Sequence, residues 1–288
     1  GTLPEVVDEP SDEFKFEKNN ILYQLDDLVF AHIYAPSGET KRYYALEPSL
    51  TEDEKNIYED IKKEILLKST DHPEMKEDEE YKNELKNILE EIVEISEGEI
   101  TTKKSGNIFK KLLVGEGSSF TLPQRSFDRI WYKIQKEIIG LGPLDPITKD
   151  KMNEDIHVLG YDKLNVNHNV YGMLQTNIDL GNEEDFKDWI EMITQRIGTP
   201  VSSDNPIIDS TLPDGSRLSL VYSEDVSVEG PTITIRQFTE EPLSLFNIVQ
   251  FGTLTPELVA YLWLGMESNA SVGVCGETAS GKTTTMNG

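Results

Sequence analysis

The sequence predicts an α/β protein with an N-terminal α+β region, a central α/β domain and the start of a further domain near the C-terminus. Three observations support this fold class. Strand-type and helix-type patterns alternate between residues 121 and 240. The first 100 residues hold 28 acidic and 11 basic side chains, which marks them as a separate acidic region. A glycine-rich loop follows an apolar run near residue 276.

The composition bears on several classes of protein. The formal net charge of the 288 residues is −26, which argues against binding nucleic acid by bulk electrostatics, so we expect no nucleic-acid partner. The single cysteine, Cys275, leaves no disulfide within the chain. No apolar run reaches the roughly 18 residues of a membrane-spanning helix. The acidic region either keeps the protein soluble or docks a partner.

The N-terminal region begins with an acidic tail, residues 1–20, that has no hydrophobic periodicity. Two strand-type runs follow at 28–34 and 41–46, and the Pro-Ser-Gly turn signal between them predicts a hairpin. We expect residues 21–120 to form one region made of this hairpin, helices and a linker.

Two amphipathic helices are expected after the hairpin. Thr51 and Glu54 form a capping box, which predicts a helix over 52–68. A second apolar stripe of helical spacing predicts a helix over 74–96. A linker rich in Gly, Ser and Lys at 98–119 closes the region.

The central domain, residues 121–240, is predicted from alternating patterns. Ser126 is expected to cap a helix over 127–139, which the segment Gly140 to Pro143 ends. Asn182 is expected to cap a second helix. This second helix and the strand-type runs cover 183–197, 157–159, 164–166, 218–222 and 232–238.

Residues 241–288 are predicted to be a linker and the start of the further domain. Pro256 is expected to open a helix that ends near Glu267. The segment 270–275 has the composition of a buried strand, and Cys275 at its end is expected to pack as a small side chain.

The four histidines do not cluster in the sequence, and no neighbouring carboxylates complete a ligand set. They are His32, His72, His157 and His168. We therefore expect packing or surface roles for them and no zinc site.

Residues 276–283 match the pattern G-x-x-x-x-G-K-[ST]. Its glycines let successive backbone N–H groups turn toward phosphate oxygens. Lys282 is expected to reach the β- and γ-phosphates of ATP, and the Thr283 hydroxyl to bind Mg²⁺. The predicted nucleotide-binding residues are Gly276, Glu277, Thr278, Ala279, Ser280, Gly281, Lys282, Thr283 and Thr284, with Lys282 also catalytic and Thr283 the metal ligand.

The alternative interpretation of this loop is a fortuitous glycine turn. The apolar run directly before it favours the phosphate site, since such loops follow a buried strand. A complete site also needs an acidic residue on a later strand. Only five residues follow Thr283, so we expect the chain to be part of a longer protein.

Five segments of the sequence resemble one protein family. They are Thr278–Asn287, Gly140–Asp145, Leu212–Arg217, Thr234–Phe238 and Tyr43–Pro48. The first resembles the Walker A segment of archaeal members of the type II/type IV secretion ATPase superfamily, which include the ATPases of archaella and type IV-like pili. The others resemble that family's central-domain landmarks, among them its "PDGSR" and "TIRKF" segments, and its archaeal N-terminal region. Gln237 stands where the family often has a base.

The resemblance implies that residues 241–288 open a RecA-like P-loop domain, truncated here just after Walker A. It implies an ATP-hydrolysing motor that powers assembly or secretion of pilin-like subunits. It also implies a homo-hexamer, a polytopic membrane platform protein as partner, and a cytoplasmic location at the inner face of the cell membrane. Arginines of this family's central domain reach nucleotide phosphates, which implies catalytic roles for Arg217 and Arg236.

Each arginine also has a plainer interpretation. In this interpretation Arg217 solvates the Pro-Asp-Gly turn before it. Arg236 forms a salt bridge on an edge strand. A guanidinium gives two directed N–H bonds to a phosphate, which favours the catalytic role. No other Lys or Arg occurs between residues 197 and 281, so each arginine is isolated among acidic neighbours.

Two other functions stay open at this point. A DNA-translocating P-loop ATPase would need a basic channel face, which the acidic N-terminal half does not offer. A docking module for a membrane partner would use the acidic region alone. We also expect the 288-residue chain by itself not to hydrolyse ATP at a useful rate, because the later acidic residue lies outside it.

Overall fold

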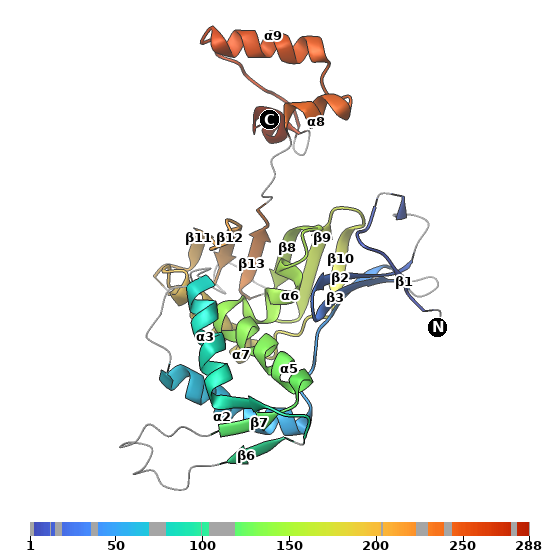
Figure 1. The fold of residues 1–288 in the computed structure, drawn as a ribbon. Coiled ribbons are helices and arrows are strands. Elements are labelled where there is room, and N and C mark those ends of the chain that lie inside the picture. Colours follow the sequence, from blue (N-terminus) through green and yellow to red (C-terminus); the bar gives the residue numbers. More distant parts are fainter. Residues whose placement is uncertain are drawn as a thin grey trace. The chain divides into compact units, whose positions relative to one another are not determined.

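The structure is a computed structural model. It describes residues 3–11, 13–14, 19–35, 40–68, 79–98, 100–103, 119–202, 204–222, 230–238, 244–277 and 281–287. Contacts divide the chain into two compact units, Gly1–Phe238 and Thr239–Gly288, and each is described by itself (Figure 1).

The main element of the first unit, within the described residues, is a ten-stranded mixed sheet. Neighbouring strands are antiparallel, except that β1 runs parallel to β2 and β4 parallel to β10. In spatial order the strands are β1 (Glu5–Val6), β2 (Asn20–Asp26), β3 (Val29–Tyr34), β4 (Arg42–Leu46), β10 (Gly172–Thr176), β9 (Lys163–His168), β8 (Asn153–Leu159), β13 (Thr232–Arg236), β12 (Arg217–Val221) and β11 (Ile207–Thr211). With the helices described below, this sheet confirms the predicted α/β class.

The expected hairpin is present and has a third strand. β3 and β4 match the runs 28–34 and 41–46, and β2 precedes them. Alternate residues such as Ile21, Ile33 and Tyr43 are fully buried, because side chains of a strand alternate between its two faces. Strands β2, β3 and β4 form a meander. Strand β1, which is part of the expected tail, pairs with β2 of this meander.

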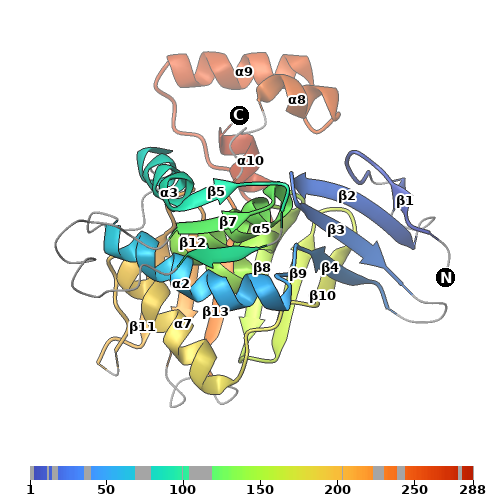
Figure 2. The same ribbon diagram turned by 60° about the horizontal axis from the view of Figure 1, so that its bottom comes forward.

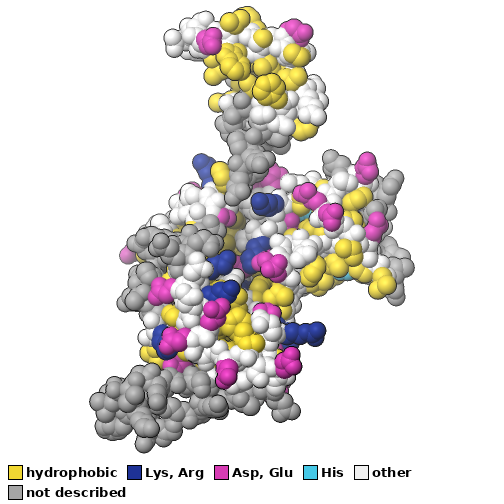
Figure 3. All heavy atoms as spheres, viewed as in Figure 1, with side chains coloured by type: hydrophobic (Ala, Val, Ile, Leu, Met, Phe, Trp, Pro, Cys, Tyr) yellow, Lys and Arg dark blue, Asp and Glu magenta, His cyan; other side chains and the backbone are white. Residues whose placement is uncertain are grey.

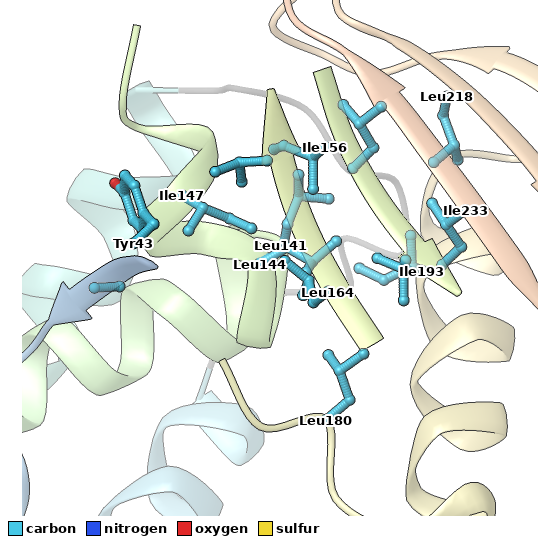
Figure 4. Close-up of a cluster of buried hydrophobic side chains, with 14 of the residues drawn as sticks. Tyr43, Leu141, Leu144, Ile147, Ile156, Leu164, Leu180, Ile193, Leu218 and Ile233 are labelled. Carbon is cyan, nitrogen blue, oxygen red and sulfur yellow. The ribbon is translucent and has the colours of Figure 1, made fainter. Parts of the chain in front are cut away.

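One face of the sheet packs against helices and forms the sheet core. The covering elements are η2 (Gly142–Leu144), α6 (Asp145–Thr148) and α7 (Glu183–Arg196), the last opened by a capping box at Asn182, as predicted. Figure 4 shows how the buried hydrophobic side chains of this core meet between strands and helices. Those labelled are Tyr43, Leu141, Leu144, Ile147, Ile156, Leu164, Leu180, Ile193, Leu218 and Ile233.

The opposite face of the sheet is mostly polar. His157, Ser219 and Thr234 lie on this face of β8, β12 and β13, and they are exposed or half-buried. Apolar residues alternate with polar ones along each of these strands, so the sequence pattern itself assigns the two faces.

A second group of helices forms the helical core of the first unit (Figure 2). Its elements are α2 (Glu52–Lys68), α3 (Glu79–Ile92), α5 (Gln124–Ile134), the π-helix η1 (Gln135–Ile139) and a small sheet of β5 (Val93–Ile95), β7 (Ser119–Leu122) and β6 (Thr101–Lys103). The apolar stripes of α2 and α3 meet Phe120, Leu122 and Ile130 there.

The helix boundaries confirm one cap and correct another. The capping box of α2 is present, since the Thr51 N–H donates to Glu54 Oε2 (2.7 Å). The predicted cap Ser126 is wrong, because α5 begins at Gln124 and the N–H of Ser126 already donates to the carbonyl of Pro123 (3.0 Å). α3 ends at Ile92, before the predicted residue 96, because the next three residues pair with β7 as β5.

The two cores cut across the domain boundary expected at residue 120. The hairpin belongs to the sheet core, through β4 beside β10, whereas α5 belongs to the helical core with α2 and α3. Glu47, just after β4, links the cores by accepting from Tyr132 Oη (2.8 Å) and Lys136 Nζ. Residues 21–120 are therefore not one packed region. Most of the expected linker, 104–118, lies outside the described residues.

The second unit contains α8 (Leu245–Gln250), α9 (Pro256–Glu267) and α10 (Lys282–Asn287). The predicted helix from Pro256 to Glu267 is confirmed. The predicted buried strand at 270–275 is wrong: the segment has no regular structure, and Val272 is 51% exposed. A strand needs a neighbour to take its backbone hydrogen bonds, and no strand of the described chain pairs with this segment.

Candidate functional site

The glycine-rich loop is described at its two ends. Gly276 and Glu277 precede the segment 278–280, which lies outside the described residues, as does the side chain of Thr283. Gly281 has φ +79°, a conformation that favours glycine, and α10 begins directly after it. The loop thus ends at Gly281, and a helix follows it directly.

Lys282 folds back across this loop. Its Nζ donates a hydrogen bond to the carbonyl of Glu277, five residues earlier, so the ammonium group spans the two described ends of the loop. The N–H of Thr285 then donates to the carbonyl of Gly281 (2.9 Å) and starts the helical hydrogen bonding.

The two helices that precede the loop in the chain carry exposed apolar side chains. Figure 3 shows hydrophobic side chains gathered over α8 and α9, where Phe246 is 86% and Tyr261 is 73% exposed. Cys275 is also exposed, which corrects the expectation that it packs as a small side chain. The sequence could not reveal this exposure, because the composition of the unit is that of a packed core.

Arg217 and Arg236 lie directly opposite each other in the sheet. Arg217 opens β12, Arg236 ends β13, and the two are paired in the antiparallel register. Both side chains are exposed on the polar face. The sequence named both residues but could not show that they are neighbours.

A carboxylate completes this row of the sheet. Asp155 on β8 is paired in register with Arg236, and Arg236 Nε donates to Asp155 Oδ1 (2.9 Å). This hydrogen bond raises the pKa of the Arg236 guanidinium further above its usual value. The salt bridge considered for Arg236 is therefore present, but β13 lies between β8 and β12 and is not an edge strand.

The turn before Arg217 is braced by its own residues. Ser216 Oγ donates to Asp214 Oδ2 (2.8 Å), and the Ser216 N–H donates to Asp214 Oδ1 (2.9 Å). Gly215 has φ +87°, and a Cβ added there would lie 3.1 Å from the Phe238 ring. Among the described residues, no hydrogen bond joins the Arg217 side chain to this turn, whose side-chain hydrogen bonds are made by Asp214 and Ser216.

The same turn fixes the end of the first unit. The Phe238 N–H donates to Ser216 Oγ (3.1 Å), and the Gln237 N–H donates to the carbonyl of Glu154 (3.0 Å). The Gln237 side chain donates to the carbonyl of Ile147 (3.1 Å). Gln237, which stands where the family often has a base, thus donates hydrogen bonds to backbone carbonyls of the first unit with both its side chain and its N–H.

The sequence missed a buried polar network beneath the meander. Tyr23 Oη (2.6 Å) and Tyr43 Oη (2.8 Å) both donate to Asp150 Oδ2. The Val170 N–H donates to His168 Nδ1 (3.1 Å), so His168 Nε2 carries the proton that faces Tyr23 Oη (3.1 Å). Burial lowers the pKa of His168 to about 4.

The histidines occupy separate places. His32 lies on β3, His157 on β8 and His168 on β9, while His72 lies outside the described residues. Within the part of the chain that is described, no group of three or more His, Cys, Asp or Glu is placed to hold a metal ion.

Among solved structures, the VirB11 ATPase from the Brucella suis type IV secretion system, in complex with sulphate, matches with a TM-score of 0.35 and 22% identity. The match covers 51% of this chain and 50% of that chain.

Relatives by sequence come from Methanocaldococcus jannaschii. The uncharacterized protein MJ0900 is 38% identical over 93% of this chain, and MJ0781 is 36% identical over 52%. The chain spans 48% of the length of the first and 22% of the second. The uncharacterized protein MJ1288 is 30% identical, over 73% of this chain and 76% of its own length.

The family model for "Type II/IV secretion system protein" matches residues 144–288. This match includes β8 to β13, both arginines and the glycine-rich loop. The chain belongs to the type II/IV secretion system protein family.

Proposed function

We propose that the chain is the N-terminal portion of an ATP-hydrolysing motor that powers assembly or secretion of pilin-like subunits, as in archaeal pili or archaella. The observation that carries the proposal is the G-x-x-x-x-G-K-[ST] loop at 276–283, inside a family match that also contains Arg217 and Arg236. By itself the 288-residue chain is proposed to be inactive, since it holds no acidic residue after the loop.

The loop is proposed to bind ATP with Mg²⁺. The Lys282 ammonium donates a hydrogen bond to the carbonyl of Glu277. When ATP binds, it would exchange this carbonyl for the phosphate oxygens, which are stronger acceptors. The backbone N–H groups of Gly276 to Thr284 hold the phosphates, and the Thr283 hydroxyl holds the metal ion. Mg²⁺ would neutralise the charge that develops on the phosphates when it is bound.

The two arginines are proposed to stabilise charge during transfer of the γ-phosphoryl group. Like charges directly opposite each other destabilise a sheet, and Asp155 compensates only one of the pair. An arrangement that costs stability and puts two exposed arginines at directly opposed positions of one sheet face suits an anionic ligand. We propose that residues 121–240, with the strands of the meander added to their sheet, carry this function.

The partners follow from the same family. We propose a homo-hexamer that works at the inner face of the cell membrane against a polytopic membrane platform protein. No helix in the described residues has the length and hydropathy to cross a membrane. No nucleic-acid partner is proposed, in keeping with the net charge of −26.

The test is ATP turnover by the full-length protein with Lys282→Ala, compared with Lys163→Ala, an exposed lysine of the sheet. We expect the first variant to lose about 100-fold or more in turnover, as when one preorganised electrostatic donor is removed. We expect the second to keep the wild-type rate. Wild-type turnover in Lys282→Ala would reject the phosphate-binding role of the loop.

A further inference from the structure

We propose that Asp155 is a positioning residue, which holds the guanidinium of Arg236 in one orientation for its anionic ligand. The inference rests on the proposed role of Arg236. Asp155 itself would touch neither nucleotide nor metal and would act only through the arginine.

The contact between the two side chains is asymmetric in burial. The Asp155 side chain is 12% exposed, whereas that of Arg236 is 69% exposed. The hydrogen bond uses Nε of Arg236, at 2.9 Å from Asp155 Oδ1. A carboxylate fixed within the sheet therefore holds the arginine at its Nε, and among the described residues no ion pair uses the two terminal amino groups.

An irregularity in β8 brings this carboxylate into place. The pairing of β8 with β9 shifts between Asn153 and Asp155, which makes Glu154 an extra residue in the strand. Such bulges re-aim the side chains beside them. The carbonyl of Glu154 then accepts from the N–H of Gln237, the residue after Arg236.

The backbone directly after Arg236 is held by two hydrogen bonds. Glu154 holds the residue after it, and Ser216 Oγ holds the N–H of Phe238, one residue further along. Asp155 adds the restraint on the side chain, which would otherwise keep most of its rotamer freedom at an exposed strand end. Two contacts thus hold the backbone just after Arg236, and the contact with Asp155 holds its guanidinium.

The opposite arginine makes this restraint necessary. Arg217 lies directly across from Arg236, so the two positive groups repel each other and turn apart unless one is held. Asp155 lies on the other side of Arg236 in the same row, and its negative charge holds Arg236 in place. No carboxylate of the described residues forms an ion pair with Arg217, so the restraint is specific to Arg236.

The test compares Asp155→Ala and Asp155→Asn in the full-length protein. Asparagine keeps the size and one acceptor oxygen but loses the charge. We expect Asp155→Ala to lower kcat by about 10-fold to 100-fold, as a small misplacement of a catalytic group does, with nucleotide affinity nearly unchanged. We expect the kcat of Asp155→Asn to lie between that of Asp155→Ala and that of the wild type. Asp209→Asn, a carboxylate of β11 bonded to Ser219, is the matched control and should keep the wild-type kcat.

A double variant separates positioning from structure. If Asp155 acts only through the arginine, adding Asp155→Ala to Arg236→Ala should lower kcat no further. An additional loss in the double variant would overturn the inference, as would an unchanged kcat in Asp155→Ala when Arg236→Ala is slow. An unchanged kcat in Arg236→Ala alone would instead reject the proposed role of the arginine.

A second measurement needs no turnover and uses the 288-residue chain. Hydrogen exchange of the Arg236 Nε–H, followed by NMR, should be slow in the wild type because Asp155 holds that proton. We expect faster exchange in Asp155→Ala and wild-type exchange in Asp209→Asn. Equal exchange in wild type and Asp155→Ala would show that the carboxylate does not hold the guanidinium, and would overturn the inference.

Discussion

Replacing each of the opposed arginines by alanine should change the stability of the first unit in different directions. Arg236→Ala removes the partner of Asp155, a carboxylate that is only 12% exposed. A largely buried acceptor left without its donor costs about 1–3 kcal/mol. Arg217→Ala removes a like charge directly opposite Arg236 and no ion pair of the described residues, so it should relieve about 0.2–1 kcal/mol of repulsion.

The assay is thermal and urea unfolding of the 288-residue chain and its variants. For a unit of this size, each kcal/mol shifts the melting temperature by roughly 2–4 °C. We therefore expect a clearly lowered melting temperature for Arg236→Ala and an unchanged or slightly raised one for Arg217→Ala. Arg42→Ala, an exposed arginine of the same sheet on β4, serves as control and should stay within about 0.5 kcal/mol.

Salt sharpens this comparison. Added salt at about 1 M screens exposed charges beyond roughly 3 Å, so it should reduce the gain from Arg217→Ala more than the loss from Arg236→Ala. Equal destabilisation by both substitutions would refute the reasoning, because it would mean that Arg217 supports the fold as Arg236 does. The interpretation of Arg217 as a residue that braces its turn would then be preferred.

Three further outcomes are expected. Gly142 has φ +58°, and a Cβ there would lie 2.9 Å from Trp189 Nε1. Gly142→Ala should therefore destabilise the first unit by about 1–3 kcal/mol in urea unfolding, and an unchanged unfolding midpoint would contradict this. His168 has a pKa of about 4 in the folded state, below the usual value near 6.5, so it adds stability that is present above pH 6.5 and lost as the pH falls toward 4. His168→Gln should therefore reduce the fall in the free energy of unfolding between pH 6.5 and 4. Identical pH profiles of stability in the variant and the wild type would contradict this role of His168. Limited proteolysis is expected to cut first within 98–119 or in the tail, residues 1–20, because of their linker-like and tail-like compositions, and first cuts within 150–240 would contradict this expectation.

Local signals in the sequence predicted elements whose causes are local. The capping box of Thr51 and Glu54 located the start of α2, and Pro256 located the start of α9, because both act within one helical turn. Ser126 misled for the same reason. A serine can cap, but Pro123 three residues earlier already ended the extended segment and opened the helix.

Features that depend on distant residues could not be predicted in this way. The parallel pairing of β4 with β10 joins segments about 130 residues apart, and nothing in either strand specifies the other. The run at 270–275 has the composition of a strand but lacks a partner in the described residues. Composition gives a preference for a strand, and neighbouring backbone decides whether one forms.

The candidate site was predictable in its parts. The glycine pattern identified Lys282, and the resemblance identified Arg217 and Arg236. The position of one arginine opposite the other, and of Asp155 beside them, required the register of three strands. Asp155 gave no sequence signal, because a single acidic residue in a strand with exposed positions is common.

ATP turnover and nucleotide affinity of the full-length protein, measured together in Arg217→Ala and Arg236→Ala, test the central claim most directly. The P-loop residues and Mg²⁺ would supply most binding of the ground state, so an arginine that meets charge in the transition state should appear in kcat. We predict that kcat falls by up to about 10³-fold in each variant, while the dissociation constant of the nucleotide stays within about threefold. A normal kcat in both variants would contradict the account.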